Sequence, residues 1–123
     1  MPAWLSTDPS LFFSKNDPQD LRLGDCARNY QGSLSGLTSD LLLWGYPDHE
    51  GIQLNGGRVG AGLAPEQIRK IFYKMTPHVL IRKKPQILDL GNINSALSLA
   101  DRHNQGAALS ELATESEIPW AGL

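Results

Sequence analysis

Two short apolar runs are the clearest pattern along the chain. Residues 41–44 form a continuous apolar stretch that is closed by Gly45, and residues 87–90, apolar except for Asp89, form a second run closed by Gly91. Short runs of this kind, bounded by glycine or proline, are typical of strands that are buried on both faces of a parallel sheet. Both runs are therefore predicted to be strands.

The segment between these strands carries apolar side chains at helical spacing. Ile68, Ile71, Phe72 and Met75 fall at i, i+3, i+4 and i+7, with charged and amide side chains on the other side. We predict an amphipathic helix that buries these four residues and ends at Pro77, each burial contributing about 1.5–3 kcal/mol. Strand, helix and strand then make one βαβ unit.

A second helix and a third strand are expected further along. The helix begins near Asn94 or Ser95, either of which can cap it, and runs toward Leu112. Its expected inner stripe consists of small and apolar residues and one histidine: Ala96, Leu99, Ala100, His103 and Ala107. Residues 119–123 look like the entry to a third strand.

The predicted fold class is α/β, and the chain is expected to be the truncated front of a larger domain. Two strands and two helices cannot cover both faces of a parallel sheet. Residues 39–123 are predicted to form the first βαβα part of this incomplete domain. Residues 1–38 are predicted to be an irregular amino-terminal arm, since prolines interrupt its aromatic anchors.

Composition and charge exclude several classes of partner. The 123 residues contain 11 Lys and Arg against 13 Asp and Glu, which gives no basic field for nucleic acid. No apolar run approaches the roughly 20 residues that span a bilayer, so no membrane partner is expected. The amino end lacks the order of a signal peptide, and Cys26 cannot form an internal disulfide alone. We therefore expect a cytoplasmic protein.

The histidines show no metal-ligand spacing. His49, His78 and His103 are widely separated. The row Asp48, His49 and Glu50 offers three ligand types, but consecutive residues rarely converge on one ion, and a polar loop tip explains them as well. His78 is expected at the surface, and His103 is expected to be packed and hydrogen-bonded. No catalytic and no metal-ligating residue is therefore assigned to this chain.

Residues 46–63 form a glycine-rich loop without a helical or alternating pattern. A dinucleotide fingerprint fails here, because Pro65 stands where the third glycine belongs. The loop does leave the carboxyl end of a predicted parallel strand, where open α/β sheets bind ligands. Asn55 and Arg58 are therefore the substrate-binding candidates. The alternative stays open that Arg58 pairs with a neighbouring acid and that Asn55 holds a glycine turn.

Three stretches resemble the amino-terminal part of the ureohydrolase superfamily, which includes arginase, agmatinase and formimidoylglutamase. They are Gly-Tyr-Pro-Asp-His-Glu-Gly at residues 45–51, Asn-Gly-Gly-Arg-Val-Gly-Ala at 55–61 and Ala-Pro-Glu-Gln-Ile-Arg at 64–69. Residues 11–18, residues 20–24 and the complete Asn-Gly-Gly-Arg point to the formimidoylglutamase branch. The resemblance runs from about residue 9 to the end, and it departs from the family at Asn92, where an aspartate is usual.

This resemblance implies a three-layer α/β/α arginase-like domain. It also implies two Mn²⁺ ions that activate a hydroxide for attack on an amidino or formimino carbon, as in histidine catabolism. The family's metal-ligand motifs are not in this sequence, which ends at residues 121–123, where the first ligand turn would begin. The isolated chain is therefore expected to bind no Mn²⁺ and to be inactive.

Two classes of function remain open at this point. The first is the amino-terminal segment of a formimidoylglutamase-like, Mn-dependent hydrolase of carbon–nitrogen bonds in linear amidines. Its expected partners are the missing carboxy-terminal half, or a second copy of itself, and a small amidine or formimino substrate. The second is a truncated, non-catalytic binding or interaction module.

Overall fold

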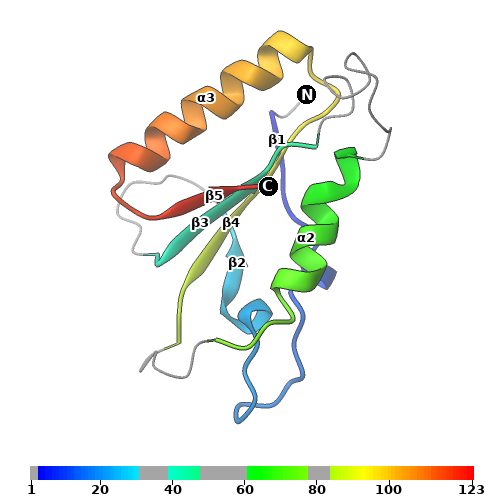
Figure 1. Ribbon diagram of the computed structural model, residues 1–123, viewed down its shortest axis with the longest axis vertical. Coiled ribbons are helices and arrows are strands. Elements are labelled where there is room, and N and C mark those ends of the chain that lie inside the picture. The colour runs from blue at the N-terminus through cyan, green and yellow to red at the C-terminus, as the bar shows by residue number, and fades with distance from the viewer. Residues whose placement is uncertain (1–2, 31–38, 48–60, 78–83) are drawn as a thin grey trace.

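The computed structural model describes residues 3–30, 39–47, 61–77 and 84–123. These residues form a mixed, mostly parallel sheet of five strands in the order β1-β4-β3-β5, with β2 also paired to β4 (Figure 1). Two α-helices accompany the sheet, α2 (Ala64–Phe72) and α3 (Leu99–Glu115). Short 3-10 turns lie at Pro9–Leu11, Leu23–Cys26 and Ala61–Leu63.

The centre of the sheet is the pair β3 (Leu41–Gly45) and β4 (Ile87–Ile93). They run parallel, with Leu42 opposite Leu88. On its other side β3 pairs in parallel with β5 (Trp120–Gly122). The three strands predicted from the apolar runs and the last residues are therefore confirmed.

The amino-terminal residues contribute two strands that the sequence did not predict. β1 (Trp4–Leu5) pairs antiparallel with the end of β4, and β2 (Ala27–Asn29) pairs in parallel with its beginning. Both lie along the edge of β4 that faces away from β3. The described part of the arm therefore extends the sheet beyond the three predicted strands. The division of the chain at residue 38 stays a prediction.

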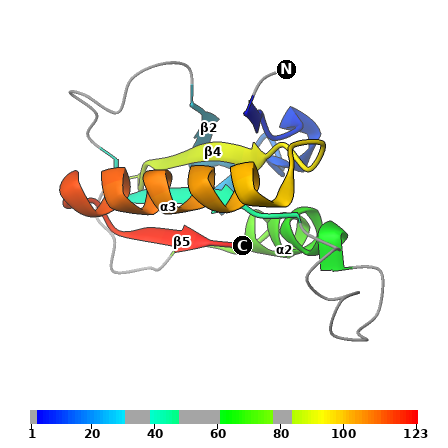
Figure 2. The ribbon, with the colours of Figure 1, turned by 90° about the horizontal axis from the view of Figure 1, so that it is seen from above.

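The two helices lie on opposite faces of the sheet (Figures 1 and 2). On one face, Ala113 of α3 packs against a cluster of buried strand residues: Leu42, Trp44, Leu88 and Leu90. On the other face, Tyr73 at the end of α2 packs with Leu43, Ile87 and Cys26. Alternation of side chains along β3 and β4 separates the two clusters. This helix–sheet–helix layering confirms the α/β fold class.

A β-bulge interrupts β4 near its carboxyl end. Leu43 is opposite Asp89, whereas Gly45 is opposite Asn92, so β4 carries one extra residue. The extra residue is accommodated at Gly91, whose φ of 82° is left-handed. Strict alternation would place residues 89 and 92 on opposite faces. The bulge instead brings the side chains of Asp89 and Asn92 to the same face, under α2.

The buried side of α2 differs from the predicted one. Ile68, Ile71 and Met75 are 43%, 70% and 53% exposed. Arg69 and Tyr73 are buried in their place. The amphipathic pattern identified the helix correctly, but the inner side is fixed by a buried ion pair, which an apolar pattern does not reveal.

The second helix also starts later than predicted and buries a different set of residues. Ser98 caps α3 by accepting a hydrogen bond from the backbone amide of Asp101. Neither Asn94 nor Ser95 begins the helix. Its buried residues are Arg102 and Ala113, whereas His103 is exposed. The expected stripe was wrong because mostly small residues leave the helical face weakly marked.

A buried polar network as the candidate functional site

The carboxyl half of β4 carries an ion pair that is buried beneath α2. Arg69 and Asp89 have side chains only 1% and 0% exposed. Nε of Arg69 donates to Oδ2 of Asp89 at 2.9 Å, and Nη2 donates to Oδ1 at 3.0 Å. This is the two-pronged geometry in which a guanidinium matches a carboxylate. The pair joins the middle of α2 to the centre of the sheet.

Three further donors complete the shell around Asp89. The hydroxyl of Tyr73 donates to Oδ2 at 2.6 Å. The hydroxyl of Thr7 and the backbone amide of Gly91 donate to Oδ1 at 2.8 and 2.9 Å. Burial, followed by the charge of Asp89, raises the pKa of Tyr73 far above its ordinary value. With its carboxylate fully paired, Asp89 anchors α2 and the amino-terminal residues to the sheet.

Arg69 also reaches the two residues at the bulge. Nη2 donates to the backbone oxygen of Gly91 at 3.0 Å, and Nη1 donates to Oδ1 of Asn92 at 2.5 Å. Asn92 in turn lies against Gly45, the last residue of β3. A Cβ atom built on Gly45 would overlap Oδ1 of Asn92 and would lie 2.7 Å from Cβ of Pro65. The end of β3, the end of β4 and the first turn of α2 therefore meet at one point.

A small hollow of about 240 Å³ opens beside this point. It is lined mainly by polar residues of the arm, of α2 and of β4: Ser6, Thr7, Asp8, Leu11, Glu66, Arg69 and Asn92. A hydrogen bond from the backbone of Ser10 lowers the pKa of Asp8, so its carboxylate is ionised at neutral pH. The hollow lies at the carboxyl end of β4, the edge where open α/β sheets bind ligands.

The predicted substrate-binding residues Asn55 and Arg58 lie outside the described residues, as do Asp48, His49 and Glu50. His78 lies there too. The structure does describe the residues on either side of the glycine-rich segment that contains Asn55 and Arg58. On one side β3 ends at Gly45, and on the other the 3-10 turn begins at Ala61.

His103 does not have the expected packed environment. It is exposed, and its ring meets the edge of Tyr46 with ring centroids 5.6 Å apart. Within residues 3–30, 39–47, 61–77 and 84–123, no group of three or more His, Cys, Asp or Glu is placed to hold a metal ion. The described residues therefore do not fit the metal centre that the resemblance implies.

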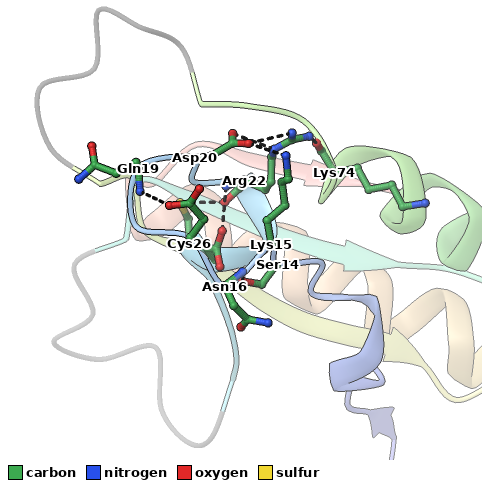
Figure 3. Close-up of polar contacts among 10 residues, drawn as sticks. Ser14, Lys15, Asn16, Gln19, Asp20, Arg22, Cys26 and Lys74 are labelled. Atoms are coloured by element: carbon green, nitrogen blue, oxygen red, sulfur yellow. Dashed lines mark hydrogen bonds and ion pairs between the residues drawn. The ribbon is translucent and has the colours of Figure 1, made fainter.

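A second polar cluster ties the arm to the far end of α2 (Figure 3). Asp20 accepts hydrogen bonds from Lys15 at 2.7 Å and from Arg22 at 3.3 Å. These two cations, Lys15 first, lower the pKa of Asp20. Arg22 also donates to the backbone oxygen of Lys74 at 2.9 Å. Because the charged groups are partly exposed, this cluster serves to attach the arm and contributes little stability.

A second hollow of about 330 Å³ lies at the opposite edge of the sheet, where β2 and β4 begin. Cys26 and Lys84 are among its lining residues. Burial raises the pKa of the Cys26 thiol, and the charge of Lys84 only partly opposes this effect. A thiol with a raised pKa is a poor nucleophile at neutral pH.

The residues of the buried network were not predicted as a site. One signal was present in the sequence, because Asp89 interrupts an otherwise apolar strand and a buried carboxylate requires a charged or hydrogen-bonding partner. The sequence did not identify that partner. Arg69 is 20 positions away and lies on the side of the helix that the apolar pattern assigned to solvent.

The comparisons with known proteins agree with the sequence resemblance. The chain is 31% identical over 99 residues to the formimidoylglutamase of Klebsiella pneumoniae (strain 342), a match that covers 76% of this chain. It is 28% identical over 99 residues to the formimidoylglutamases of Salmonella heidelberg (strain SL476) and Salmonella enteritidis PT4 (strain P125109), covering 75% of this chain. The chain spans only about 30% of the length of these relatives.

No family model matches the chain, and no solved structure matches it significantly. None of the helices that the structure describes is long and apolar enough to cross a membrane. The matches establish that about three quarters of this chain is related to part of a formimidoylglutamase. The chain therefore has a partial relationship to the ureohydrolase family.

Proposed function

From this partial relationship, we propose that the chain is the amino-terminal segment of a cytoplasmic, formimidoylglutamase-like hydrolase. Its substrate is a small formimino compound of the formiminoglutamate type. Hydrolysis adds water to the formimino carbon and breaks its bond to the glutamate nitrogen, which gives formamide and glutamate. The similarity to the Klebsiella pneumoniae protein is the observation that carries this proposal.

The position of the glycine-rich segment supports the proposal. The segment connects the carboxyl end of β3 to α2, and ligands of open α/β sheets bind beyond the carboxyl ends of the strands. The contact among Gly45, Pro65 and Asn92 holds both ends of the segment at this edge. A substrate that binds there would lie beside the segment.

Asn55 and Arg58 are the residues that we propose for substrate binding. Arg58 is the only lysine or arginine between residues 46 and 63. A glutamate-type substrate carries carboxylates, and a planar guanidinium can bind a carboxylate through two hydrogen bonds. Asn55 precedes it in the same run and supplies an amide donor and acceptor.

The proposal includes two Mn²⁺ ions for the complete enzyme, as the resemblance implies. The described residues supply no suitable ligand group. No step of the reaction is therefore assigned to metal ligands in this chain. The carboxy-terminal part of such an enzyme, or a second copy of the chain, is the proposed source of the ligands.

The test uses the complete protein that the gene encodes, purified with Mn²⁺ present. Release of glutamate from formiminoglutamate is the expected result, with a smaller rate on agmatine. The variant Arg58→Lys keeps the charge but loses the two-pronged geometry. We expect kcat/KM for formiminoglutamate to fall about tenfold to a hundredfold, or roughly 1.4–2.7 kcal/mol, with little change in Tm.

Two results would contradict parts of this proposal. Equal losses on formiminoglutamate and on agmatine, together with a lower Tm, would show that Arg58 holds the loop together and does not bind a carboxylate. Absence of hydrolysis with either compound, while calorimetry still detects formiminoglutamate binding, would instead favour the non-catalytic binding module.

A further inference from the structure

We infer that the outer edge of β5 is a docking surface for a second copy of this chain, whose own β5 pairs with it in antiparallel orientation around a two-fold axis. This inference goes beyond the proposed function and does not depend on the reaction. Among the described strands, β5 stands at the end of the order and pairs with β3 alone. Figure 2 shows β5 along the margin of the sheet, beside α3 and not beneath it.

The backbone of β5 directs hydrogen-bonding groups away from β3. The carbonyl of Pro119 accepts a hydrogen bond from β3 at 2.9 Å, and the amide of Leu123 donates one to β3 at 2.8 Å. Successive residues of a strand direct their backbone groups to opposite edges, so the N–H and C=O groups of Trp120 and Gly122 point outward. The outer edge therefore offers donors and acceptors to another strand.

Charge and proline, which commonly protect edge strands from pairing, do not protect the outer edge of β5. Residues 118–123 contain no charged side chain, and Pro119, the one proline among them, directs its carbonyl to β3. Two copies of this edge therefore meet without electrostatic repulsion. Because the strand is only three residues long and supplies few hydrogen bonds, its side chains have to contribute much of the affinity.

The side chains on the α3 face make this edge complementary to itself. The Trp120 ring stacks on Trp44 with ring centroids 4.6 Å apart, yet Trp120 remains 42% exposed. An antiparallel pairing centred on Ala121 places Trp120 of one copy directly opposite Gly122 of the other. The exposed indole can then lie over the glycine and reach Trp44 of that copy, whose ring is 3.6 Å from the position of a Cβ atom on Gly122.

This fit favours a second copy over an unrelated strand. Any strand could satisfy the outward backbone groups of β5. A residue other than glycine opposite Trp120 would project its own side chain into the space that the indole needs. In the pairing of two copies, the largest side chain of each β5 meets the smallest side chain of the other, twice around the axis.

The experiment measures the oligomeric state of the complete protein that the gene encodes, by sedimentation velocity from about 1 to 100 μM. We expect the mass to rise from one polypeptide to two across this range. Gly122→Pro removes an outward N–H without removing a bond to β3, and it should raise the dissociation constant at least about tenfold. Leu5→Lys is the matched control, because Leu5 is 47% exposed on β1 at the opposite side of the sheet. It should leave the dissociation constant within about twofold.

Gly122→Ala separates the side-chain fit from the backbone pairing. It keeps the outward N–H, and its Cβ would make only an ordinary contact with Trp44, so the fold is retained. The added methyl group occupies the space that receives Trp120 of the other copy. We expect the dissociation constant to rise about tenfold. An unchanged value would overturn the pairing centred on Ala121.

Amide exchange followed by NMR distinguishes association from folding. The amides of Trp120 and Gly122 should exchange about tenfold more slowly at high protein concentration than at low concentration, because they are bonded only in the dimer. The amide of Leu123, which is bonded to Trp44 in each copy, is the internal control and should change less.

Three results would overturn the proposal. They are a monomer at every concentration, a dimer whose dissociation constant is unchanged by Gly122→Pro, and protection of the Trp120 and Gly122 amides that does not depend on concentration. The last result would show that a strand of the same polypeptide covers the edge. None of these measurements uses the hydrolytic reaction, so their failure is distinct from a failure of the proposed function.

Discussion

The two faces of the sheet are built from different kinds of interaction. Beneath α3, the contacts among Leu42, Trp44, Leu88 and Leu90 are apolar. Beneath α2, a large part of the contact is the buried pair of Arg69 and Asp89 with its hydrogen bonds. Strands β3 and β4 contribute to both faces, so the same strands support two interfaces with different physical requirements.

The two interfaces differ in the substitutions that they tolerate. Apolar packing is non-directional, so a core of this kind accepts substitutions that preserve volume. A buried ion pair has strict geometry, and its main consequence is one fixed arrangement, since the desolvation of both charges cancels much of their attraction. The α3 face therefore supplies stability, and the α2 face supplies a defined position for the end of β4.

Asp89→Asn is the substitution that should destabilise the α2 face most. The change preserves size but leaves the charge of Arg69 buried without a counter-ion. We expect the free energy of unfolding to fall by about 3–5 kcal/mol, measured by urea denaturation. The double variant Arg69→Met with Asp89→Leu should recover most of this loss, because it removes both charges. A loss below about 1 kcal/mol for Asp89→Asn would show that the pair is not desolvated in solution.

The matching test on the α3 face uses Leu88, which lies one residue before Asp89 and is 2% exposed. Leu88→Ala creates a cavity and should cost about 2–5 kcal/mol. Leu88→Met preserves the volume and should cost less than about 1.5 kcal/mol. Both values come from the same denaturation experiment. If Leu88→Met were as damaging as Asp89→Asn, the two faces would not differ in tolerance.

The same distinction explains how much of the fold the sequence predicted. The runs at 41–44 and 87–90 locate the central strands because burial on both faces favours apolar side chains at nearly every position, and Asp89 is the one exception within them. The strands of the arm were missed, since Trp4–Leu5 and Ala27–Asn29 are too short to show a pattern. They are held by pairing with β4, which is a long-range contact and leaves no local signal.

The candidate site was less predictable than the fold. The pairing of Asp89 with Arg69 depends on the orientation of α2, and the contact of Asn92 with Arg69 depends on the bulge at Gly91. Gly91 was interpreted as the end of the strand, although a glycine inside a strand can equally mark a bulge. Polar partners brought together by tertiary structure cannot be read from a periodicity of apolar residues.

High pH should weaken the α2 face selectively. Burial and the charge of Asp89 raise the pKa of Tyr73 above its ordinary value of 10.0, so the folded protein keeps this proton when the unfolded chain loses it. The contribution is fully present below pH 10 and declines above it, by about 1.4 kcal/mol per pH unit. Unfolding measured from pH 8 to 11 should show this slope in the original protein. Tyr73→Phe removes the titrating group, and an identical slope in this variant would contradict the assignment.

Truncation of Ile71, on the exposed side of α2, should change the free energy of unfolding least. The apolar pattern predicted that Ile71 is buried and contributes stability, whereas the structure leaves it 70% exposed. Truncation at an exposed helical site removes little contact, and alanine has the higher helix propensity. Ile71→Ala should therefore change the free energy of unfolding by less than about 0.5 kcal/mol, at low protein concentration. Ile87→Ala, on the same face but 3% exposed, is the matched control and should cost about 2–5 kcal/mol. A loss above about 1.5 kcal/mol for Ile71→Ala that grows with protein concentration would show that α2 is covered in solution by a second copy of the chain.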